Sequence, residues 1–318
     1  MGYQHMTRAF IFPGQGSQAV GMGKELAEVF PAAGQVFEEV DEALKQNLKQ
    51  LMFEGPEEEL MLTENAQPAL MAVSMAAMAV IEEEGGLDAG EACRFVAGHS
   101  LGEYTALTAA GALSLADAAG LLKLRGRAMQ DAVPVGEGAM AALIGLDLDK
   151  ARAVAADAAD GDVCEAANDN APGQVVLSGS RAAIGRVLET APGCGARRCI
   201  LLPVSAPFHC ALMAPAAEAV AVALDGITVS GPAVPLIANV TAGPVEDPAD
   251  IRRLLVEQVT GMVRWRESVL YMLGKGVDTL VEVGSGKVLT GLVRRIDRDL
   301  TGVAVTAPDE IEAFLKTL

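Results

Sequence analysis

The residues around Ser100 have the types and spacing that nucleophilic catalysis uses. The segment Gly98-His99-Ser100-Leu101-Gly102 matches G-x-S-x-G, in which a serine lies on a sharp turn between a strand and a helix. The mostly apolar residues 93–97 predict the strand, and residues 103–110 predict the helix. Small residues beside the serine let the two backbones cross closely in a strained turn. The pattern predicts an exposed nucleophile, with the Leu101 backbone N–H facing a developing oxyanion; the alternative is an ordinary serine in a turn.

A serine nucleophile needs a general base, and the chain has three histidines that could serve. His5 belongs to residues 1–6, which we interpret as cloning residue before a native start at Met6. His99 is adjacent to Ser100, and adjacent residues on an extended segment point to opposite sides. His209 is therefore the expected base if Ser100 is a nucleophile; the alternative is a structural histidine in an apolar segment.

Several segments of the chain match those of a known enzyme family. With Phe12-Pro13-Gly14-Gln15-Gly16-Ser17-Gln18, the Ser100 and His209 segments resemble the malonyl-CoA:acyl carrier protein transacylases of fatty acid synthesis and the acyltransferase domains of polyketide synthases. The resemblance runs from about Thr7 to the C-terminus. Several motifs in the same order identify a family far more specifically than the G-x-S-x-G turn alone. Further matching segments are Leu124-Arg125-Gly126, Asn170-Ala171-Pro172-Gly173-Gln174-Val175-Val176, Gln258-Val259-Thr260-Gly261-Met262-Val263-Arg264-Trp265 and Glu282-Val283-Gly284-Ser285-Gly286-Lys287-Val288-Leu289.

This resemblance implies a reaction. A malonyl group would pass from malonyl-CoA to Ser100, and from the malonyl-serine ester to the phosphopantetheine thiol of acyl carrier protein, with ping-pong kinetics and no cofactor. His209 would accept the proton from each attacking group. Two alternatives remain: an acyltransferase for another extender unit such as methylmalonyl, and a serine esterase or patatin-type hydrolase.

The resemblance also implies groups that assist Ser100 and His209. The oxyanion hole would consist of the backbone N–H groups of Gln15 and Leu101. The backbone carbonyl of Gln258 would accept the Nδ1–H of His209, which makes Ser100 and His209 a dyad. No sequence motif identifies a carboxylate behind the histidine.

Arg125 is the predicted determinant of substrate class. A malonyl group ends in a carboxylate, which a guanidinium binds through two parallel hydrogen bonds. From helical position alone, an exposed arginine is the alternative. Phe208 resembles the bulky residue of malonyl-selective members and would exclude a 2-methyl branch. Asn168 and Gln174 are expected to line the small-domain side of the substrate pocket.

Charge restricts the partners. The chain of 318 residues carries a formal net charge of −18, which argues against nucleic acid and anionic membranes. Acyl carrier proteins are acidic too, so docking requires a local basic patch. The alternative is that the basic residues near the C-terminal motifs are scattered surface charges. The candidate residues for the patch are Arg252, Arg253, Arg264, Arg266, Lys275 and Lys287.

Composition indicates a cytoplasmic protein, which we expect to be a monomer. The most apolar stretch, residues 68–81, is short for a membrane span, and no signal-peptide pattern is present. The five cysteines form no C-x-x-C pair, so we interpret them as reduced thiols, with Cys210 as a packing residue. No metal site is expected.

The order of predicted elements indicates two α/β units. Residues 7–134 and 206–318 are expected to form a large α/β-hydrolase-like catalytic domain with a short parallel sheet. Residues 135–205 show the order βαββαβ, which predicts an inserted small ferredoxin-like α+β domain. A cleft between the domains would hold Ser100 and His209. The predicted elements are strands 8–12, 139–146, 163–167, 174–178 and 198–202, and helices 68–84, 103–110, 114–129, 149–159 and 181–190.

Two glycine-rich segments match nucleotide-binding patterns only weakly. Residues 14–19 fit G-x-G-x-x-A, but Pro13 and further glycines do not favour a helix start there. Residues 284–287 resemble the end of the P-loop pattern G-x-x-x-x-G-K-[ST]. However, Val281 occupies the position of the first glycine, and Val288 occupies that of the serine or threonine. We therefore expect no nucleotide site at either place.

Overall fold

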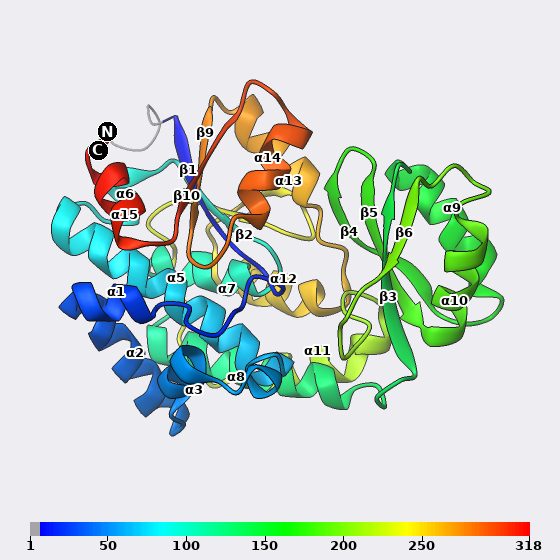
Figure 1. The fold of residues 1–318 in the computed structure, drawn as a ribbon, viewed down its shortest axis with the longest axis horizontal. Coiled ribbons are helices and arrows are strands. Elements are labelled where there is room, and N and C mark those ends of the chain that lie inside the picture. Colours follow the sequence, from blue (N-terminus) through cyan, green and yellow to red (C-terminus); the bar gives the residue numbers. More distant parts are fainter. Residues whose placement is uncertain (1–6) are drawn as a thin grey trace.

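The protein is described by a computed structural model that covers residues 7–318 (Figure 1). Residues 1–6, which the sequence marked as cloning residue, lie outside the described residues. Within residues 7–318, no helix is both long and apolar enough to cross a membrane.

A six-stranded sheet forms the centre of the larger part, in the order β10-β9-β1-β2-β7-β8. All neighbouring pairs are parallel except β7 and β8. The central strands are buried along nearly their whole length, as expected for a parallel sheet covered on both faces. The bounds are β1 (Arg8–Phe12), β2 (Phe95–Gly98), β7 (Leu236–Ala238), β8 (Gly243–Val245), β9 (Thr279–Val283) and β10 (Thr301–Val305).

The long helix α5 (Thr63–Gly85) lies in the core and packs against α2, α7 and α8. It begins at Thr63, not at Pro68 as predicted, so Pro68 lies inside the helix. Proline supplies no backbone donor there, but burial of Thr63, Asn65, Ala66 and Gln67 stabilises the additional turn. The other helices of this part are α1 (Lys24–Val29), α2 (Pro31–Leu44), α3 (Leu48–Glu54), α4 (Glu57–Leu60), α6 (Ala89–Ala92), α7 (Leu101–Ala109), α8 (Leu115–Asp131), α11 (Ala214–Asp225), α12 (Pro248–Thr260), α13 (Trp265–Gly274), α14 (Val288–Ile296) and α15 (Pro308–Leu315), with a 3₁₀ turn η2 (Ala211–Met213).

Helix α8 begins where its capping signal predicts. Ser114 Oγ accepts a hydrogen bond from the Asp117 backbone N–H at 3.0 Å and donates to Asp117 Oδ2 at 2.7 Å. This cap fixes the start of the helix that carries Arg125.

The second part is an antiparallel four-stranded sheet in the order β4-β5-β3-β6. Its chain order is βαββαβ, so its topology is the predicted ferredoxin-like one. Helices α9 and α10 lie together on one face of this sheet, at the right of Figure 1, and form a separate apolar core with it. The bounds are β3 (Gly138–Ile144), α9 (Leu148–Ala159), β4 (Cys164–Ala171), β5 (Gln174–Ser180), α10 (Arg181–Thr190) and β6 (Arg198–Leu201).

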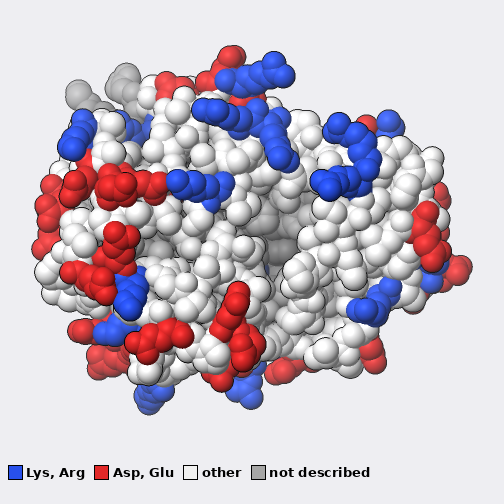
Figure 2. All heavy atoms as spheres, in the orientation of Figure 1, with Lys and Arg blue, Asp and Glu red and all other residues white. Residues whose placement is uncertain are grey.

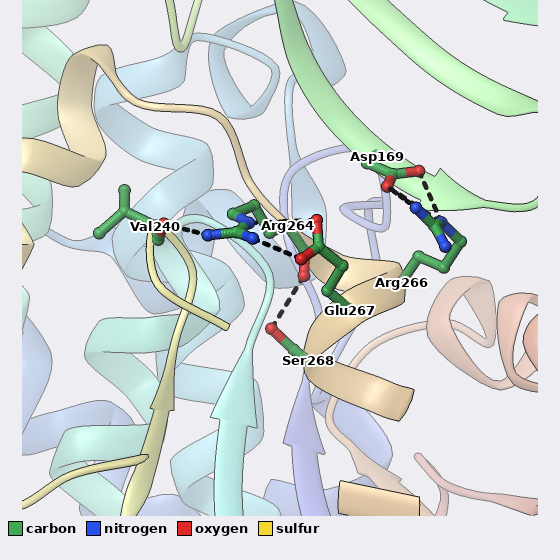
Figure 3. A network of polar contacts seen from close by, with 6 residues as sticks. All are labelled: Asp169, Val240, Arg264, Arg266, Glu267 and Ser268. Carbon is green, nitrogen blue, oxygen red and sulfur yellow. Dashed lines mark hydrogen bonds and ion pairs between the residues drawn. The ribbon is translucent and has the colours of Figure 1, made fainter. Parts of the chain in front are cut away.

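Strand β4 joins the small sheet to the larger part. Val263 N–H donates to Ala167 O at 2.8 Å, and Asp169 N–H donates to Val263 O at 2.9 Å. Arg266 on α13 also holds the buried Asp169 carboxylate with Nε and Nη2, at 2.7–3.1 Å (Figure 3). The Arg266–Asp169 ion pair and two backbone hydrogen bonds of Val263 therefore fix β4 against the segment before α13.

Candidate active site

Ser100 lies on a strained turn between β2 and α7. Its backbone has φ 55° and ψ −108°, which is a left-handed conformation that residues other than glycine rarely adopt. The flanking glycines are required by close approach. A Cβ on Gly98 would lie 1.9 Å from the Gly102 carbonyl, and one on Gly102 would lie 2.3 Å from Phe12 O. The turn therefore presents Ser100 at the carboxyl ends of β1 and β2.

Asn239, just after β7, holds this turn from the neighbouring strand. Its Oδ1 accepts the Ser100 backbone N–H at 2.8 Å, and its Nδ2 donates to Gly98 O at 2.7 Å. Sequence reasoning did not identify Asn239. The available signal was its position after the short apolar segment 234–238, where a parallel strand would end.

His209 lies within hydrogen-bond distance of Ser100. Its Nε2 lies 2.8 Å from Ser100 Oγ, and its Nδ1 lies 2.9 Å from Gln258 O and 3.1 Å from Gly261 O. Because carbonyl oxygens only accept, Nδ1 carries the hydrogen and Nε2 is free to accept the serine proton. Burial and then the Arg125 charge lower the His209 pKa to about 3, so the ring is neutral near pH 7.

Arg125 is buried beside the nucleophile and not exposed on its helix. The residue is 1% exposed, and its Nη2 donates to Ser100 Oγ at 3.0 Å and to Gln258 Oε1 at 2.9 Å. Nη1 donates to Gln67 Oε1 at 2.8 Å. Burial lowers the pKa of Arg125. An arginine guanidinium nevertheless keeps its charge in proteins. Neutral oxygens therefore orient this cation, and Gln67 is a second residue that sequence reasoning missed.

His99 is not placed to act on Ser100 Oγ. Its Nε2 lies 2.9 Å from Asn170 Oδ1 on β4, and its ring lies beside Trp265 with centroids 5.7 Å apart. Burial lowers its pKa. His99 thus links the serine turn to the small sheet.

A cavity of about 430 Å³ opens onto Ser100 between the two parts, at the central hollow of Figure 2. The predicted residues that line it are Gln15, Leu101, Arg125, Asn168, Phe208 and His209, together with Ser100 itself. Within residues 7–318, neither the Gln15 nor the Leu101 backbone N–H donates a hydrogen bond. Both donors are therefore available to a group bound in the cavity.

Gln174 lies outside this cavity, contrary to the prediction. It is the first residue of β5, beside the turn at 172–173, and its Oε1 accepts from Arg295 Nη1 at 2.9 Å. It lines a second hollow of about 890 Å³ that also contains several arginines. The strand direction explains the difference, since Asn168 lies on β4 beside Val263 whereas Gln174 begins the next strand after the turn.

The glycine-rich segment 284–287 supports the loop that carries Gln15. Ser285 Oγ donates to Ser17 O at 2.7 Å, and a Cβ on Gly286 would meet Ser17 at 3.1 Å. Within residues 7–318, no group of three or more His, Cys, Asp or Glu side chains is placed to hold a metal ion. All five cysteines are free, and buried Cys210 donates to Pro207 O at 3.1 Å.

The basic residues singled out near the C-terminal motifs are mostly satisfied within the chain. Arg266 pairs with Asp169, Arg253 with Asp250 and Glu257, and Lys287 with Glu310. Arg264 pairs with Glu267, also drawn in Figure 3, and Arg252 donates to two backbone carbonyls. These contacts leave little free positive charge there.

Comparisons with known proteins agree in family and fold. The acyl transferase domain family matches residues 9–307. The malonyl CoA-acyl carrier protein transacylases of Bacillus subtilis and Escherichia coli K12 are 47% and 46% identical to this chain, over 98% and 97% of it and 96% and 98% of their own length.

Solved structures give the same result. An acyl-carrier-protein-S-malonyltransferase from Bartonella henselae is 56% identical with a TM-score of 0.96, over 98% of this chain and 99% of that one. A malonyl-transacylase solved in complex with its type II PKS acyl-carrier protein is 42% identical with a TM-score of 0.95, over 98% of this chain and 100% of that one.

Proposed function

This chain belongs to the acyl transferase family, and we propose that it transfers a malonyl group from malonyl-CoA to the phosphopantetheine thiol of acyl carrier protein. The observation that carries the proposal is the position of Ser100 Oγ, which lies 2.8 Å from His209 Nε2 and 3.0 Å from Arg125 Nη2. A nucleophile, a neutral base and a buried cation thus meet at one oxygen. A simple ester hydrolase needs no cation to bind an acyl carboxylate.

In the first step, Ser100 Oγ attacks the thioester carbonyl of malonyl-CoA while His209 Nε2 takes its proton. The tetrahedral oxyanion accepts hydrogen bonds from the Gln15 and Leu101 backbone N–H groups. The C–S bond then breaks, and the CoA sulfur leaves with the proton held on His209. The products are a malonyl-serine ester and CoA thiol.

In the second step, the phosphopantetheine thiol gives its proton to His209 Nε2, and its sulfur attacks the ester carbonyl. The C–Oγ bond breaks, and Ser100 regains the proton from His209. Malonyl thioester forms on the carrier, and the enzyme returns to its starting state. The backbone carbonyls of Gln258 and Gly261 keep the imidazole in the required tautomer throughout.

Arg125 is proposed to bind the malonyl carboxylate. Its hydrogen-bond partners, the side chains of Gln67, Ser100 and Gln258, are uncharged. The cation therefore remains available for an anionic group in the cavity. Phe208, which is 8% exposed and lines the cavity, is proposed to exclude a 2-methyl branch, and Asn168 on β4 to line the side formed by the small sheet. The methylmalonyl and hydrolase alternatives are not favoured by the named relatives.

We propose that the acidic carrier docks over the second hollow. Arginines from both parts of the molecule line it, and Figure 2 shows basic side chains on both sides of the upper part of the central hollow. Substitution Arg295→Glu should raise the KM for acyl carrier protein more than the KM for malonyl-CoA. The lining arginines are Arg197, Arg198, Arg294, Arg295 and Arg298, with Asp297 and Asp299 beside them.

We take the enzyme to be a cytoplasmic monomer that uses no cofactor.

The proposed function is tested by intact mass after brief exposure to malonyl-CoA or acetyl-CoA, followed by addition of acyl carrier protein. We expect a malonyl adduct that the carrier protein removes, and much less acetyl adduct. Equal labelling by both thioesters, or an adduct that the carrier cannot remove, would contradict the proposal.

A further inference from the structure

Glu103 is a buried carboxylate that the two steps above do not use. It lies on the first turn of α7 with 1% of its surface exposed. Its Oε2 accepts from the Asn239 backbone N–H at 3.0 Å and from Gln258 Nε2 at 2.9 Å, while Oε1 has no hydrogen-bond partner within residues 7–318. Burial raises the pKa of this carboxyl to about 7. A residue that served only as filler would be apolar, because a buried carboxylate is costly.

Gln258 connects Glu103 to the reacting groups. Its side chain is fully buried; Nε2 donates to Ser100 O at 2.8 Å as well as to Glu103, and Oε1 accepts from Arg125 Nη2 at 2.9 Å. Its backbone carbonyl accepts from His209. One glutamine therefore contacts the nucleophile's backbone, the base and the cation.

The direction of the Gln258 amide matters because its two ends have opposite hydrogen-bonding character. If the amide were turned over, its NH₂ group would face the donors of Arg125 and its oxygen would face the acceptor oxygens of Glu103 and Ser100. Glu103 Oε2 accepts in either protonation state of the carboxyl, because a proton would lie on the unpartnered Oε1, so it holds the NH₂ end on its own side and directs the oxygen toward Arg125.

Glu103 is also separated from Arg125 by this amide. A carboxylate bonded directly to the guanidinium would occupy the position that an acyl carboxylate needs. With Gln258 between them, Arg125 is oriented by neutral oxygens only.

We propose that Glu103 is a positioning residue that acts through the Gln258 side chain to orient Arg125, and thereby sets the preference for a malonyl over an acetyl group. This inference rests on the proposed function.

The test compares Glu103→Gln with Glu103→Leu, and measures the ratio of acylation kcat/KM for malonyl-CoA to that for acetyl-CoA. Glutamine keeps an oxygen that can accept both bonds, so its ratio should stay within about threefold of the unsubstituted protein. Leucine removes this acceptor and leaves the Gln258 NH₂ group held mainly by the Ser100 carbonyl, so Arg125 should be oriented less well and the ratio should fall at least tenfold. A folded Glu103→Leu protein that keeps the ratio would overturn the proposal.

Glu282→Gln is the matched control. Glu282 is also buried, but its carboxylate receives the backbone N–H groups of Leu289 and Thr290 at the start of α14, away from Arg125. This variant should lower the unfolding midpoint without changing the ratio. A ratio change equal to that of Glu103→Leu would assign both effects to general destabilisation and overturn the proposal.

Gln258→Leu keeps the inference testable if Glu103→Leu does not fold. It removes the connecting amide and leaves the backbone carbonyl that faces His209, so the ratio should fall at least tenfold. An unchanged ratio in Gln258→Leu would overturn the inference alone, whereas absence of any malonyl adduct on the unsubstituted protein would overturn the proposed function itself.

Discussion

Arg125 donates a hydrogen bond from Nη2 to Ser100 Oγ over 3.0 Å. The cation therefore touches the nucleophile before any substrate is present, and it can stabilise negative charge that develops on Oγ. In the proposed function, the same guanidinium also binds the carboxylate of the malonyl group. This one contact connects reactivity to substrate choice.

Replacement of Arg125 by alanine should change the choice of acyl group. Loss of one partner of a buried charge pair typically costs about 2–5 kcal/mol, so the malonyl-to-acetyl ratio of kcat/KM should fall at least about thirtyfold. Because both substrates are measured on the same protein, a general loss of folded enzyme cancels from the ratio. Equal losses for both thioesters would mean that Arg125 does not select the acyl group.

His209→Ala should slow acylation by roughly 10²–10⁴, the usual contribution of a positioned general base. His99→Ala is the matched control, because His99 binds Asn170 and lies beside Trp265 instead of contacting Oγ. Rates of adduct formation should be compared at equal folded concentration. A larger loss of rate for His99→Ala than for His209→Ala would mean that His209 is not the base.

The lowered pKa of His209 predicts an unusual pH profile. A general base acts in its neutral form, and a pKa of about 3 keeps His209 neutral far below the ordinary value of 6.5. Acylation by acetyl-CoA, which has no carboxylate of its own, should change less than about twofold between pH 7 and pH 5. A half-loss near pH 6.5 would contradict the buried, neutral histidine.

The same shift has a consequence for stability. Between the folded pKa of about 3 and the unfolded value near 6.5, the unfolded chain binds a proton at His209 that the folded chain does not. The contribution of His209 to stability is therefore full above pH 6.5 and is lost as the pH falls through this window. Replacement of His209 by Gln should make the unfolding free energy fall less steeply between pH 6 and pH 4.

Asp169→Asn should loosen the connection between the small sheet and the larger part. Asp169 has 1% of its side chain exposed and Arg266 has 28%, and removal of one partner of a buried pair costs about 3 kcal/mol or more. Denaturant unfolding should show a marked loss. Arg253→Gln, which removes ion pairs on the exposed face of α12, should leave the midpoint unchanged. Equal midpoints for Asp169→Asn and the unsubstituted protein would show that the pair does not hold β4.

The sequence predicted local structure well where the signal is local. Strand β1 and helix α10 have the predicted bounds, and the Ser114 cap opens α8 as its spacing indicates. The ferredoxin-like order of the small sheet also follows from element order alone. The start of α5 was wrong because Pro68 was taken as the first residue of the helix, whereas burial in the core extends it back to Thr63.

The supporting residues of the site could not be predicted in this way. Asn239 reaches the serine turn from 139 residues away, and Gln67 reaches Arg125 from 58 residues away. Such contacts depend on how strands and helices are placed in three dimensions, and no periodicity or spacing encodes them. Gln174 was misplaced for the same reason, since its side chain accepts from Arg295, which lies 121 residues away in the chain.

The most direct test of the account is the intact mass of the protein and of Ser100→Ala after brief exposure to malonyl-CoA. The account predicts that the unsubstituted protein gains one malonyl group, that acyl carrier protein removes it, and that Ser100→Ala gains none. A malonyl adduct that persists on the Ser100→Ala protein would contradict the central claim that Ser100 carries the acyl group.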